Sequence, residues 1–412
     1  MKKTVLLTLV LCLTLGLMFG FIFCRDGLNE ALATAESASA AEPAESAETA
    51  GEETAGEEEA AEGAGRLDFE ALYALYEPEE IVMTIGDREI TWGEYFYYLY
   101  RYATNVEQFF DNYAMYGMNL AWGDTLEEDG TETYADYVIE TAESTALSIS
   151  AMGAFADSIG TVLSEENRAA IAEKEQADYT AACGENATRE DFEAFLKTIY
   201  MPTAVYDYMN EVSVLFQQGF LELYGETGEK LSDEETLAWM EKSGYMSSNH
   251  ILFMTIDMTT GEALDEETKA EKLAQAQAVA DELKAIGDRD ALLARFAELK
   301  QELDEDTGKT AYPDGYVFTP GRMVSEFEET TAAQQPYEVS DPVETAYGYH
   351  VIMTLPLDPD AVIQYSDNGA PMTARALAAS ETYTTLVDAY ALEQELVWRE
   401  GYAAPDLTAF VK

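Results

Sequence analysis

The stretch that decides the fold of this chain runs from Pro320 to Leu355 and reads PGRMVSEFEETTAAQQPYEVSDPVETAYGYHVIMTL. The first half predicts a turn and then a short helix, with Met323 and Phe327 on one face because they lie one helical turn apart. The second half predicts two strands with a turn at Tyr347-Gly348, since Pro and Gly interrupt runs of β-branched residues.

The chain contains only two histidines, and each stands near the start of a predicted strand. His350 lies in the stretch above, and His250 opens the apolar run His-Ile-Leu-Phe-Met-Thr-Ile. If the two strands are neighbours in a sheet, the imidazoles face each other across one site. Such histidines are usually structural, and a pair without nearby cysteine partners is a poor zinc site. We therefore predict no metal and no cofactor.

Several blocks of this region resemble the parvulin peptidyl-prolyl isomerases, most closely the extracytoplasmic foldases of the PrsA and SurA type. The blocks are Ser248–Leu252, Gly321–Val324 with Phe327, Asp341–Thr345 and Gly348–Ile352. They follow one another in the family's order over roughly residues 245–357. The resemblance implies a small antiparallel-rich sheet flanked by helices, and an enzyme that isomerises X-Pro bonds without a cofactor.

The resemblance also implies roles for six side chains. The catalytic residues would be His250, Asp306 and His350, and the substrate-binding residues would be Met323, Phe327 and Thr345. The histidines would form a hydrogen-bonded pair with Thr345 in their network, while the thioether and the phenyl ring would grip the proline. The alternatives are plain core packing for the apolar pair and a solvated loop acid for Asp306.

One loop departs from the family pattern. The family usually has Gly-Gly-Asp-Leu-Gly before the strand that follows Asp306, whereas this chain has Tyr312-Pro-Asp-Gly-Tyr316. The departure leaves the exact position of Asp306 open.

The N-terminus predicts a membrane segment. Two lysines precede an apolar run without charge from Val5 to Cys24, which is long enough to cross a bilayer core of ~30 Å. Cleavable signal peptides usually have a shorter apolar stretch, so we predict an uncleaved anchor at 1–25 with the N-terminus inside. Cleavage within Leu32–Ala35 and lipidation at Cys24 are the alternatives. All three place the rest of the chain outside the cytoplasm.

Charge and composition describe the next part of the chain. From residue 34 on, the segment 26–65 is almost only Ala, Glu, Ser, Thr and Gly, which predicts a disordered acidic linker, with an Ala/Glu-rich helix as the alternative. The whole chain has 80 Asp and Glu against 23 Lys and Arg. This balance argues against nucleic acid and anionic lipid surfaces as partners. It suits a protein that keeps unfolded clients soluble, although general solubility explains it equally well.

Residues 66–243 predict helices after one hairpin, as in the N-terminal chaperone region of the same foldases. The hairpin joins Ile81–Ile85 to Arg88–Ile90, and Thr91 then caps a helix with Glu94 as its capping-box partner. Further helices are predicted at 132–158, 165–182, 189–200, 203–224 and 233–242. The first helix carries aromatic residues on every side, which predicts either core packing or an exposed apolar cradle for unfolded chains.

The sequence thus predicts an α+β fold: a helical chaperone domain, built from N-terminal helices and a C-terminal helix near 373–400, with a parvulin-like domain inserted and a transmembrane helix in front. The predicted segments are the anchor 1–25, the linker 26–65, the chaperone region 66–243, the isomerase domain 244–357 and the C-terminal part 358–412. Two functions fit. One is a membrane-bound extracytoplasmic foldase that isomerises X-Pro bonds in exported polypeptides and holds them. The other is a non-catalytic tethered chaperone whose parvulin-like domain only binds peptides.

Overall fold

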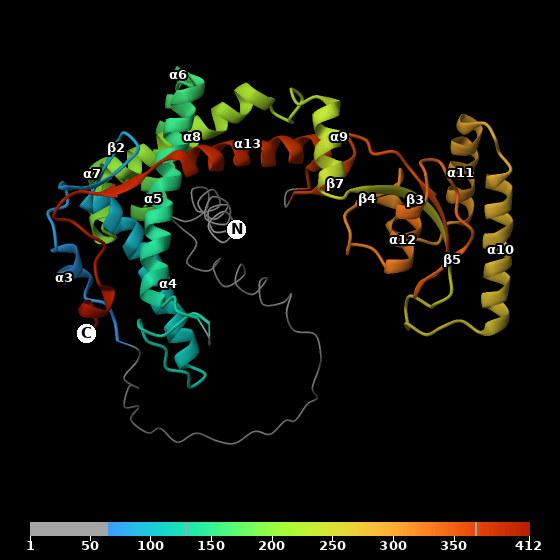
Figure 1. Cartoon of the computed structure of the whole chain (residues 1–412), viewed down its shortest axis with the longest axis horizontal. Coiled ribbons are helices and arrows are strands. Elements are labelled where there is room, and N and C mark those ends of the chain that lie inside the picture. The colour runs from blue at the N-terminus through green and yellow to red at the C-terminus, as the bar shows by residue number, and fades with distance from the viewer. Residues whose placement is uncertain (1–64, 128–129, 367–368) are drawn as a thin grey trace. The chain divides into compact units, whose positions relative to one another are not determined.

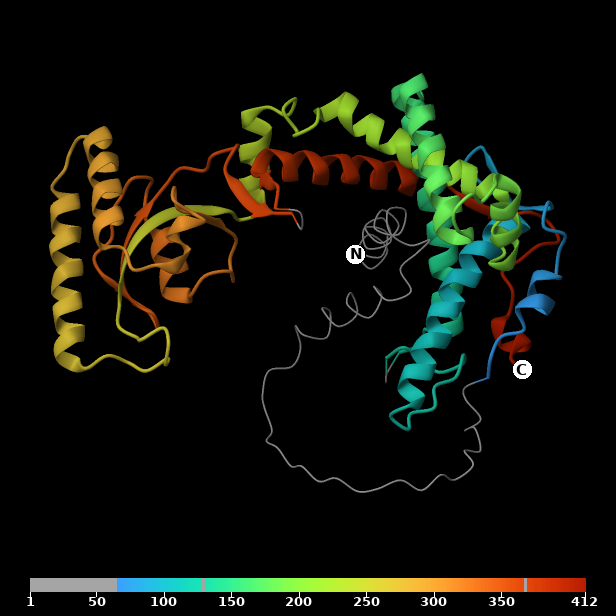
Figure 2. The same ribbon diagram turned by 180° about the vertical axis from the view of Figure 1, so that it is seen from behind.

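The computed structural model describes residues 65–127, 130–366 and 369–412, which combine helices with antiparallel sheets. The predicted anchor at 1–25 and all but the last residue of the linker at 26–65 lie outside the described residues. Within the described part, no helix has the length and apolar character needed to span a bilayer. Two compact units are present, one formed by the described residues up to Glu222 with Thr384–Lys412, the other by Leu223–Tyr383 (Figures 1 and 2).

The first unit is mainly helical and carries a three-stranded sheet in the order β2-β1-β9. Its strands are β1 (Ile81–Ile85), β2 (Arg88–Thr91) and β9 (Leu396–Trp398). Its helices are α3 (Phe69–Tyr73), α4 (Trp92–Ala114), α5 (Tyr134–Ile159), α6 (Glu165–Cys183), α7 (Arg189–Thr198), α8 (Thr203–Tyr224) and the 3₁₀ helix η2 (Leu407–Phe410), with α8 continuing to the unit's border.

The C-terminal segment differs from the prediction. Helix α13 (Ala374–Glu393) ends early, and the apolar run at Leu396–Trp398 pairs antiparallel with β1, with Trp398 opposite Met83. The prediction of one helix reaching Glu400 is therefore wrong. The open edge of β1 offers backbone hydrogen bonds to this run, and such pairing overrides local helix propensity.

At the start of α4, only one of the two hydrogen bonds of the predicted capping box is present. The Thr91 hydroxyl accepts a hydrogen bond from the backbone N–H of Glu94, as predicted. The Glu94 carboxylate, however, accepts two hydrogen bonds from Arg88, at 2.7 and 2.9 Å, and one from Tyr98 at 3.0 Å. The predicted reciprocal capping box at this helix is therefore wrong, because the half-buried Arg88 guanidinium competes for the carboxylate.

The aromatic residues of α4 are mostly core. Of the eleven aromatic residues between Trp92 and Tyr116, six are buried, four are half-buried and only Tyr116 is clearly exposed. Trp398 from β9 packs edge to face on Tyr95, with ring centroids 5.1 Å apart. Of the two alternatives for this helix, the burial supports core packing. Because the hairpin, α5 and the C-terminal strand surround this helix, aromatic residues can be buried on every side of it.

The second unit contains a four-stranded antiparallel sheet in the order β4-β3-β6-β5. Its strands are β3 (Met246–Met254), β4 (Tyr316–Phe318), β5 (Val343–Glu344) and β6 (Gly348–Thr354). The other elements are α9 (Asp233–Lys242), α10 (Glu266–Lys284), α11 (Arg289–Leu303), η1 (Thr307–Thr310), α12 (Ser325–Ala333), the hairpin of β7 (Val362–Tyr365) and β8 (Pro371–Thr373), and the first part of α13. The small β7–β8 hairpin lies between β6 and α13 in the chain.

The two faces of this sheet carry different groups. Side chains alternate between faces along a strand, so odd-numbered residues of β3 and β6 point one way and even-numbered residues the other. Ile251, Phe253 and Val351 pack with α10 and α11 in one core cluster. Ile352 packs with Phe318 and with Phe327 of α12 in a separate cluster on the opposite face. That second face also carries both histidines.

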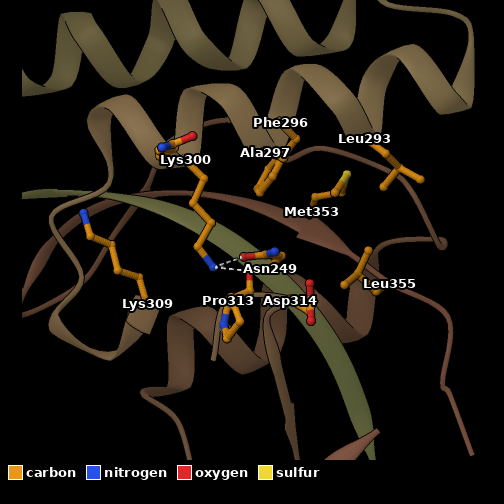
Figure 3. Close-up of a pocket in the computed structure, with 11 residues that line it drawn as sticks. Asn249, Leu293, Phe296, Ala297, Lys300, Lys309, Pro313, Asp314, Met353 and Leu355 are labelled. Atoms are coloured by element: carbon orange, nitrogen blue, oxygen red, sulfur yellow. Dashed lines mark hydrogen bonds between the residues drawn. The ribbon is translucent and has the colours of Figure 1, made fainter. Parts of the chain in front are cut away.

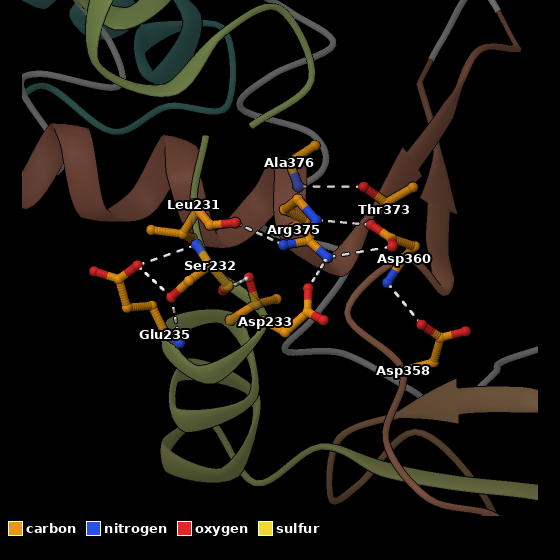
Figure 4. A network of polar contacts seen from close by, with 10 residues as sticks. Leu231, Ser232, Asp233, Glu235, Asp358, Asp360, Thr373, Arg375 and Ala376 are labelled. Carbon is orange, nitrogen blue, oxygen red and sulfur yellow. Dashed lines mark hydrogen bonds and ion pairs between the residues drawn. The ribbon is translucent and has the colours of Figure 1, made fainter. Parts of the chain in front are cut away.

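In the second unit, the buried Arg375 connects three segments outside the four-stranded sheet (Figure 4). The Arg375 guanidinium, at the start of α13, donates to the carbonyl oxygen of Leu231 at 2.6 Å. It also pairs with Asp233 at 2.6 Å and with Asp360 at 2.7 Å. One side chain thus joins the segment before α9 to the segment after β6, within the compact unit Leu223–Tyr383.

Candidate active site

The two histidines lie on one face of the sheet, on neighbouring strands. In the ladder of β3 and β6, His250 is opposite Ile352 and His350 is opposite Leu252. The ring centroids are 5.0 Å apart and the ring planes meet at 74°, an edge-to-face contact. Among the described residues, neither ring nitrogen of His250 has a hydrogen-bond partner. The predicted hydrogen-bonded pair is therefore wrong, since two edge-to-face rings do not align a donor with an acceptor.

His350 is held by the segment that precedes its own strand. Its Nε2 lies 2.9 Å from the Thr345 hydroxyl, which also accepts the backbone N–H of Tyr347 at 3.1 Å. Burial and, to a smaller extent, the nearby His250 ring lower the pKa of His350 to about 3. His350 is consequently neutral at ordinary pH, and Thr345 orients its ring.

Asp306 lies beside His250. Its Oδ2 is 3.4 Å from His250 Nε2 and accepts a 2.6 Å hydrogen bond from the Tyr316 hydroxyl, while Oδ1 accepts the backbone N–H of Gly308 at 2.9 Å. The contact with His250, together with these hydrogen bonds, holds the pKa of Asp306 well below its ordinary value. Burial and the bond to this carboxylate raise the pKa of Tyr316. The site therefore contains a fixed negative charge next to an imidazole.

Backbone pairing fixes the position of Asp306. Strand β4 covers only the first part of β3, so the edge near Leu252 is free for another segment. The Asp304 carboxylate accepts the N–H of Leu252 at 2.9 Å and that of Asp306 at 3.1 Å, and the N–H of Glu305 donates to the Leu252 carbonyl at 3.0 Å. Asp306 reaches the site even though the following loop departs from the family pattern.

The apolar wall comes from α12 and the turn before it. The Phe327 ring meets both imidazoles edge to face, at 5.3 Å from His250 and 5.6 Å from His350. Met323 is half-buried and packs against the same cluster. The Glu328 carboxylate accepts the backbone N–H groups of Gly321, Arg322 and Met323 at 2.8 to 3.0 Å, which fixes the turn.

These groups line a single pocket of about 590 Å³. Five of the six predicted residues line it, and Thr345, predicted to bind substrate, does not. The full lining is His250, Leu252, Met254, Met258, Asp306, Thr307, Tyr316, Arg322, Met323, Val324, Phe327, Tyr347 and His350. Its size lies within the range of small-ligand pockets. In the part of the chain that the structure describes, no three His, Cys, Asp or Glu side chains gather as a metal ion would require.

Tyr316 is the most important residue that sequence reasoning missed. Its ring stacks on His250, with centroids 5.7 Å apart and planes within 7°. Tyr316 is opposite Ser248 in the β3–β4 ladder, so it shares a face with His250. This signal becomes visible only once the register is known. The alternation of side chains along β3 could have predicted Leu252 and Met254 as site residues, since they follow His250 at two-residue steps and so share its face.

The comparisons with known proteins agree with this geometry. Residues 250–355 match the rotamase family model, described as the PPIC-type PPIASE domain. This part of the chain is a parvulin-type domain. Foldase protein PrsA of Halalkalibacterium halodurans is 34% identical over 134 residues, which cover 32% of this chain and 34% of that protein. Foldase protein PrsA of Geobacillus kaustophilus is 47% identical over 58 residues, covering 14% of this chain and 21% of that protein.

The chain thus matches about a third or less of the length of these curated relatives. Among solved structures, PrsA from Bacillus subtilis is 18% identical with a TM-score of 0.23, and it covers 65% of this chain and 90% of that chain. A superposition at this TM-score does not establish a shared arrangement of parts. The assignment of the parvulin-type domain therefore depends on the sequence match and on the geometry of the site.

Proposed function

We propose that this protein is an extracytoplasmic foldase whose parvulin-type domain catalyses cis-trans isomerisation of X-Pro peptide bonds in exported polypeptides. The observation that carries the proposal is that His250, His350, Asp306, Met323 and Phe327 line one pocket of about 590 Å³. The relatives named as PrsA foldases, and the match to the PPIC-type domain, support the same reaction.

The reaction itself explains which groups are needed. Rotation about a peptide bond is slow because amide resonance must be broken, with a barrier of ~18–20 kcal/mol. In the twisted state the nitrogen is more amine-like and the carbonyl is less polarised. A catalyst therefore needs no nucleophile or metal, only contacts that favour the twisted state over the planar one. A thousandfold acceleration requires ~4 kcal/mol of such preference.

The pocket offers these contacts in two parts. Met323 and Phe327, with Leu252 on the sheet below, form an apolar wall for the pyrrolidine ring. The ionised Asp306 lies at the polar end of the pocket. A carboxylate near the substrate carbonyl disfavours the resonance form with most negative charge on oxygen, which is the planar form. His250 and neutral His350 form the floor between the two parts.

Substitution of the apolar wall tests the proposal. Met323→Ala removes the thioether from the proline pocket, and we expect kcat/KM for a short X-Pro peptide to fall roughly tenfold. Met115→Ala is the matched control, because Met115 is 76% exposed and belongs to the other unit. Isomerisation is measured by NMR exchange between the cis and trans peptide. A folded wild-type protein that leaves the exchange rate unchanged would overturn the proposal.

We further infer that the first unit holds unfolded segments while the parvulin-type domain acts on them. Supporting this, exposed apolar side chains follow the end of α4, at Met115, Tyr116 and Met118. If the wild-type protein suppresses aggregation of an unfolded client without accelerating isomerisation, the non-catalytic chaperone replaces the foldase.

Attachment to the membrane is part of the same proposal and rests on the apolar run in residues 1–25. Cells that express the chain without these residues should release it from the membrane fraction, whereas the full chain stays there. Equal membrane association of both forms would remove the anchor from the proposal.

A further inference from the structure

The face of the sheet opposite the histidines contains a second pocket with a buried lysine. This pocket of about 510 Å³ lies between α11, β3 and the loop before β4, and its apolar lining includes Leu293, Phe296 and Met353 (Figure 3). Lys300 extends into it from α11, and only 8% of the residue is exposed. Lysine is rarely buried to this extent unless it is paired, so its partners need an explanation.

The partners of Lys300 are all uncharged oxygens. Its Nζ donates to the Asn249 side-chain oxygen at 2.7 Å and to the backbone carbonyls of Tyr312 and Pro313 at 3.3 and 3.1 Å. Three acceptors satisfy all three N–H groups of an ammonium, which fixes its position. Burial lowers the pKa of Lys300. A buried charge without a carboxylate partner costs stability. We therefore look for the role of Lys300 in the positions of the groups that it binds.

Two of these three acceptors belong to the loop that departs from the family pattern, Tyr312–Tyr316. The loop runs close against β3: a Cβ on Gly315, which has φ of +107°, would lie 2.5 Å from the carbonyl oxygen of Ser248. The Tyr312 ring also contacts the Tyr316 ring, with centroids 4.9 Å apart. Lys300 thus holds the start of the loop that leads directly into Tyr316.

The third acceptor connects Lys300 to His250. The side-chain oxygen of Asn249 accepts the backbone N–H of His250 at 2.9 Å in addition to the Lys300 ammonium. On the other face of the sheet, the Tyr316 ring stacks on His250 and its hydroxyl donates to Asp306. The Lys300 ammonium thus binds the loop that leads to Tyr316 and also binds Asn249, the residue before His250.

We propose that Lys300 is a positioning residue for the isomerase site, which holds Tyr316 against His250 and Asp306 from the opposite face of the sheet. Lys300 does not line the pocket of the histidines, so it acts only through the loop and Asn249. The kinetic consequence rests on the function proposed above, whereas the structural consequence does not.

The first experiment replaces Lys300 with a side chain that fills space but donates no hydrogen bond. In Lys300→Met the carbonyls of Tyr312 and Pro313 lose their donor, and we expect kcat/KM for an X-Pro peptide to fall about tenfold. Gln301→Met is the matched control, since Gln301 is exposed, lines the same pocket and makes no side-chain hydrogen bond among the described residues. Lys300→Arg keeps the donors and should retain most of the rate.

The second experiment measures the stacking of Tyr316 on His250 directly. The chain has only two histidines, so NMR of histidine labelled with ¹³C in the ring resolves His250 from His350. Loss of the stacked Tyr316 ring should shift the His250 resonance in Lys300→Met, while Gln301→Met leaves it in place. An unchanged His250 resonance in a folded Lys300→Met protein would overturn the proposal. If this variant does not fold, Lys300→Leu, which is shorter and also lacks a donor, replaces it throughout.

A double-mutant cycle separates positioning from a general loss of stability. If Lys300 acts through Tyr316, Lys300→Met should cause almost no further loss of kcat/KM in a Tyr316→Ala background. Losses that multiply would show independent action and overturn the proposal. If the wild-type protein has no isomerase activity, the proposed function fails on its own, and the His250 resonance still decides whether Lys300 positions the stack.

Discussion

At the residue scale, His350 shows how burial in the parvulin-type domain changes ionisation. Its pKa in the folded protein is about 3, because burial and the neighbouring His250 disfavour the charged ring. In the unfolded chain a histidine has its ordinary pKa of about 6.5. Between these two values the unfolded state binds a proton that the folded state does not. The folded protein should therefore lose stability as the pH falls through this window.

The corresponding prediction compares the wild type with His350→Gln. Between pH 7 and pH 4 the unfolding free energy of the wild type should decrease by roughly 3 kcal/mol more than that of the variant. Carboxylates such as Asp306 also titrate in acid, but they contribute nearly equally to both proteins and cancel in the difference. Urea unfolding of both proteins at several pH values measures this difference in unfolding free energy. Parallel pH profiles for the two proteins would contradict the burial argument.

Side chains of the site differ in how far the sequence alone could identify them. The two histidines, Met323 and Phe327 stand in blocks that resemble a family, so their convergence could be expected. Other features depend on strand register and loop geometry: the stacking of Tyr316, the hydrogen bonds of Lys300 and the edge-to-face contact of the imidazoles. Sequence spacing contains no information on either, because these contacts join elements that lie far apart along the chain.

At the scale of elements, the turn before α12 positions the apolar wall of the pocket. Glu328 accepts three backbone N–H groups of that turn, and these hydrogen bonds lower the pKa of its carboxyl group. Charge-assisted bonds of this kind are stronger than bonds between neutral groups. The turn therefore depends on one side chain that never enters the pocket.

We predict that Glu328→Ala loosens this turn without unfolding the domain. The backbone amides of Gly321 and Met323 should exchange with solvent at least tenfold faster, since their acceptor is gone. The value of kcat/KM for an X-Pro peptide should fall about fivefold as Met323 becomes mobile. Glu329→Ala is the control, because that neighbouring side chain is exposed. Unchanged amide exchange in Glu328→Ala would show that the turn is held by other contacts.

Element boundaries were the easiest part of the fold to predict, and long-range pairing was the hardest. Capping residues at Ser164, Thr188 and Ser232 begin helices where the sequence indicated, because a cap acts locally. The strand at Leu396–Trp398 was predicted as helix, since its partner β1 lies more than three hundred residues earlier in the sequence. Local propensity cannot reveal a partner at that distance.

At the scale of the whole molecule, each of the two units has its own buried core. The C-terminal segment belongs to the first unit: Leu407 is fully buried there, and the backbone N–H of Asp68 donates to Phe410. Both histidines belong to the second unit. A substitution near the C-terminus should therefore destabilise one unit and leave the reporters of the other unit unchanged.

Leu407→Ala tests this independence. Removing a fully buried leucine side chain should lower the unfolding free energy of the first unit by roughly 2–5 kcal/mol, because a cavity remains. With Trp239 of the other unit replaced by Phe, fluorescence of the buried Trp92 and Trp122 follows the first unit, while the ring resonances of His250 and His350 follow the other. Val397→Ala serves as the control, since its side chain is 45% exposed on β9. If the histidine resonances were lost together with the tryptophan signal, the two units would unfold as one cooperative body, and the parvulin-type domain would depend on the C-terminus for its stability.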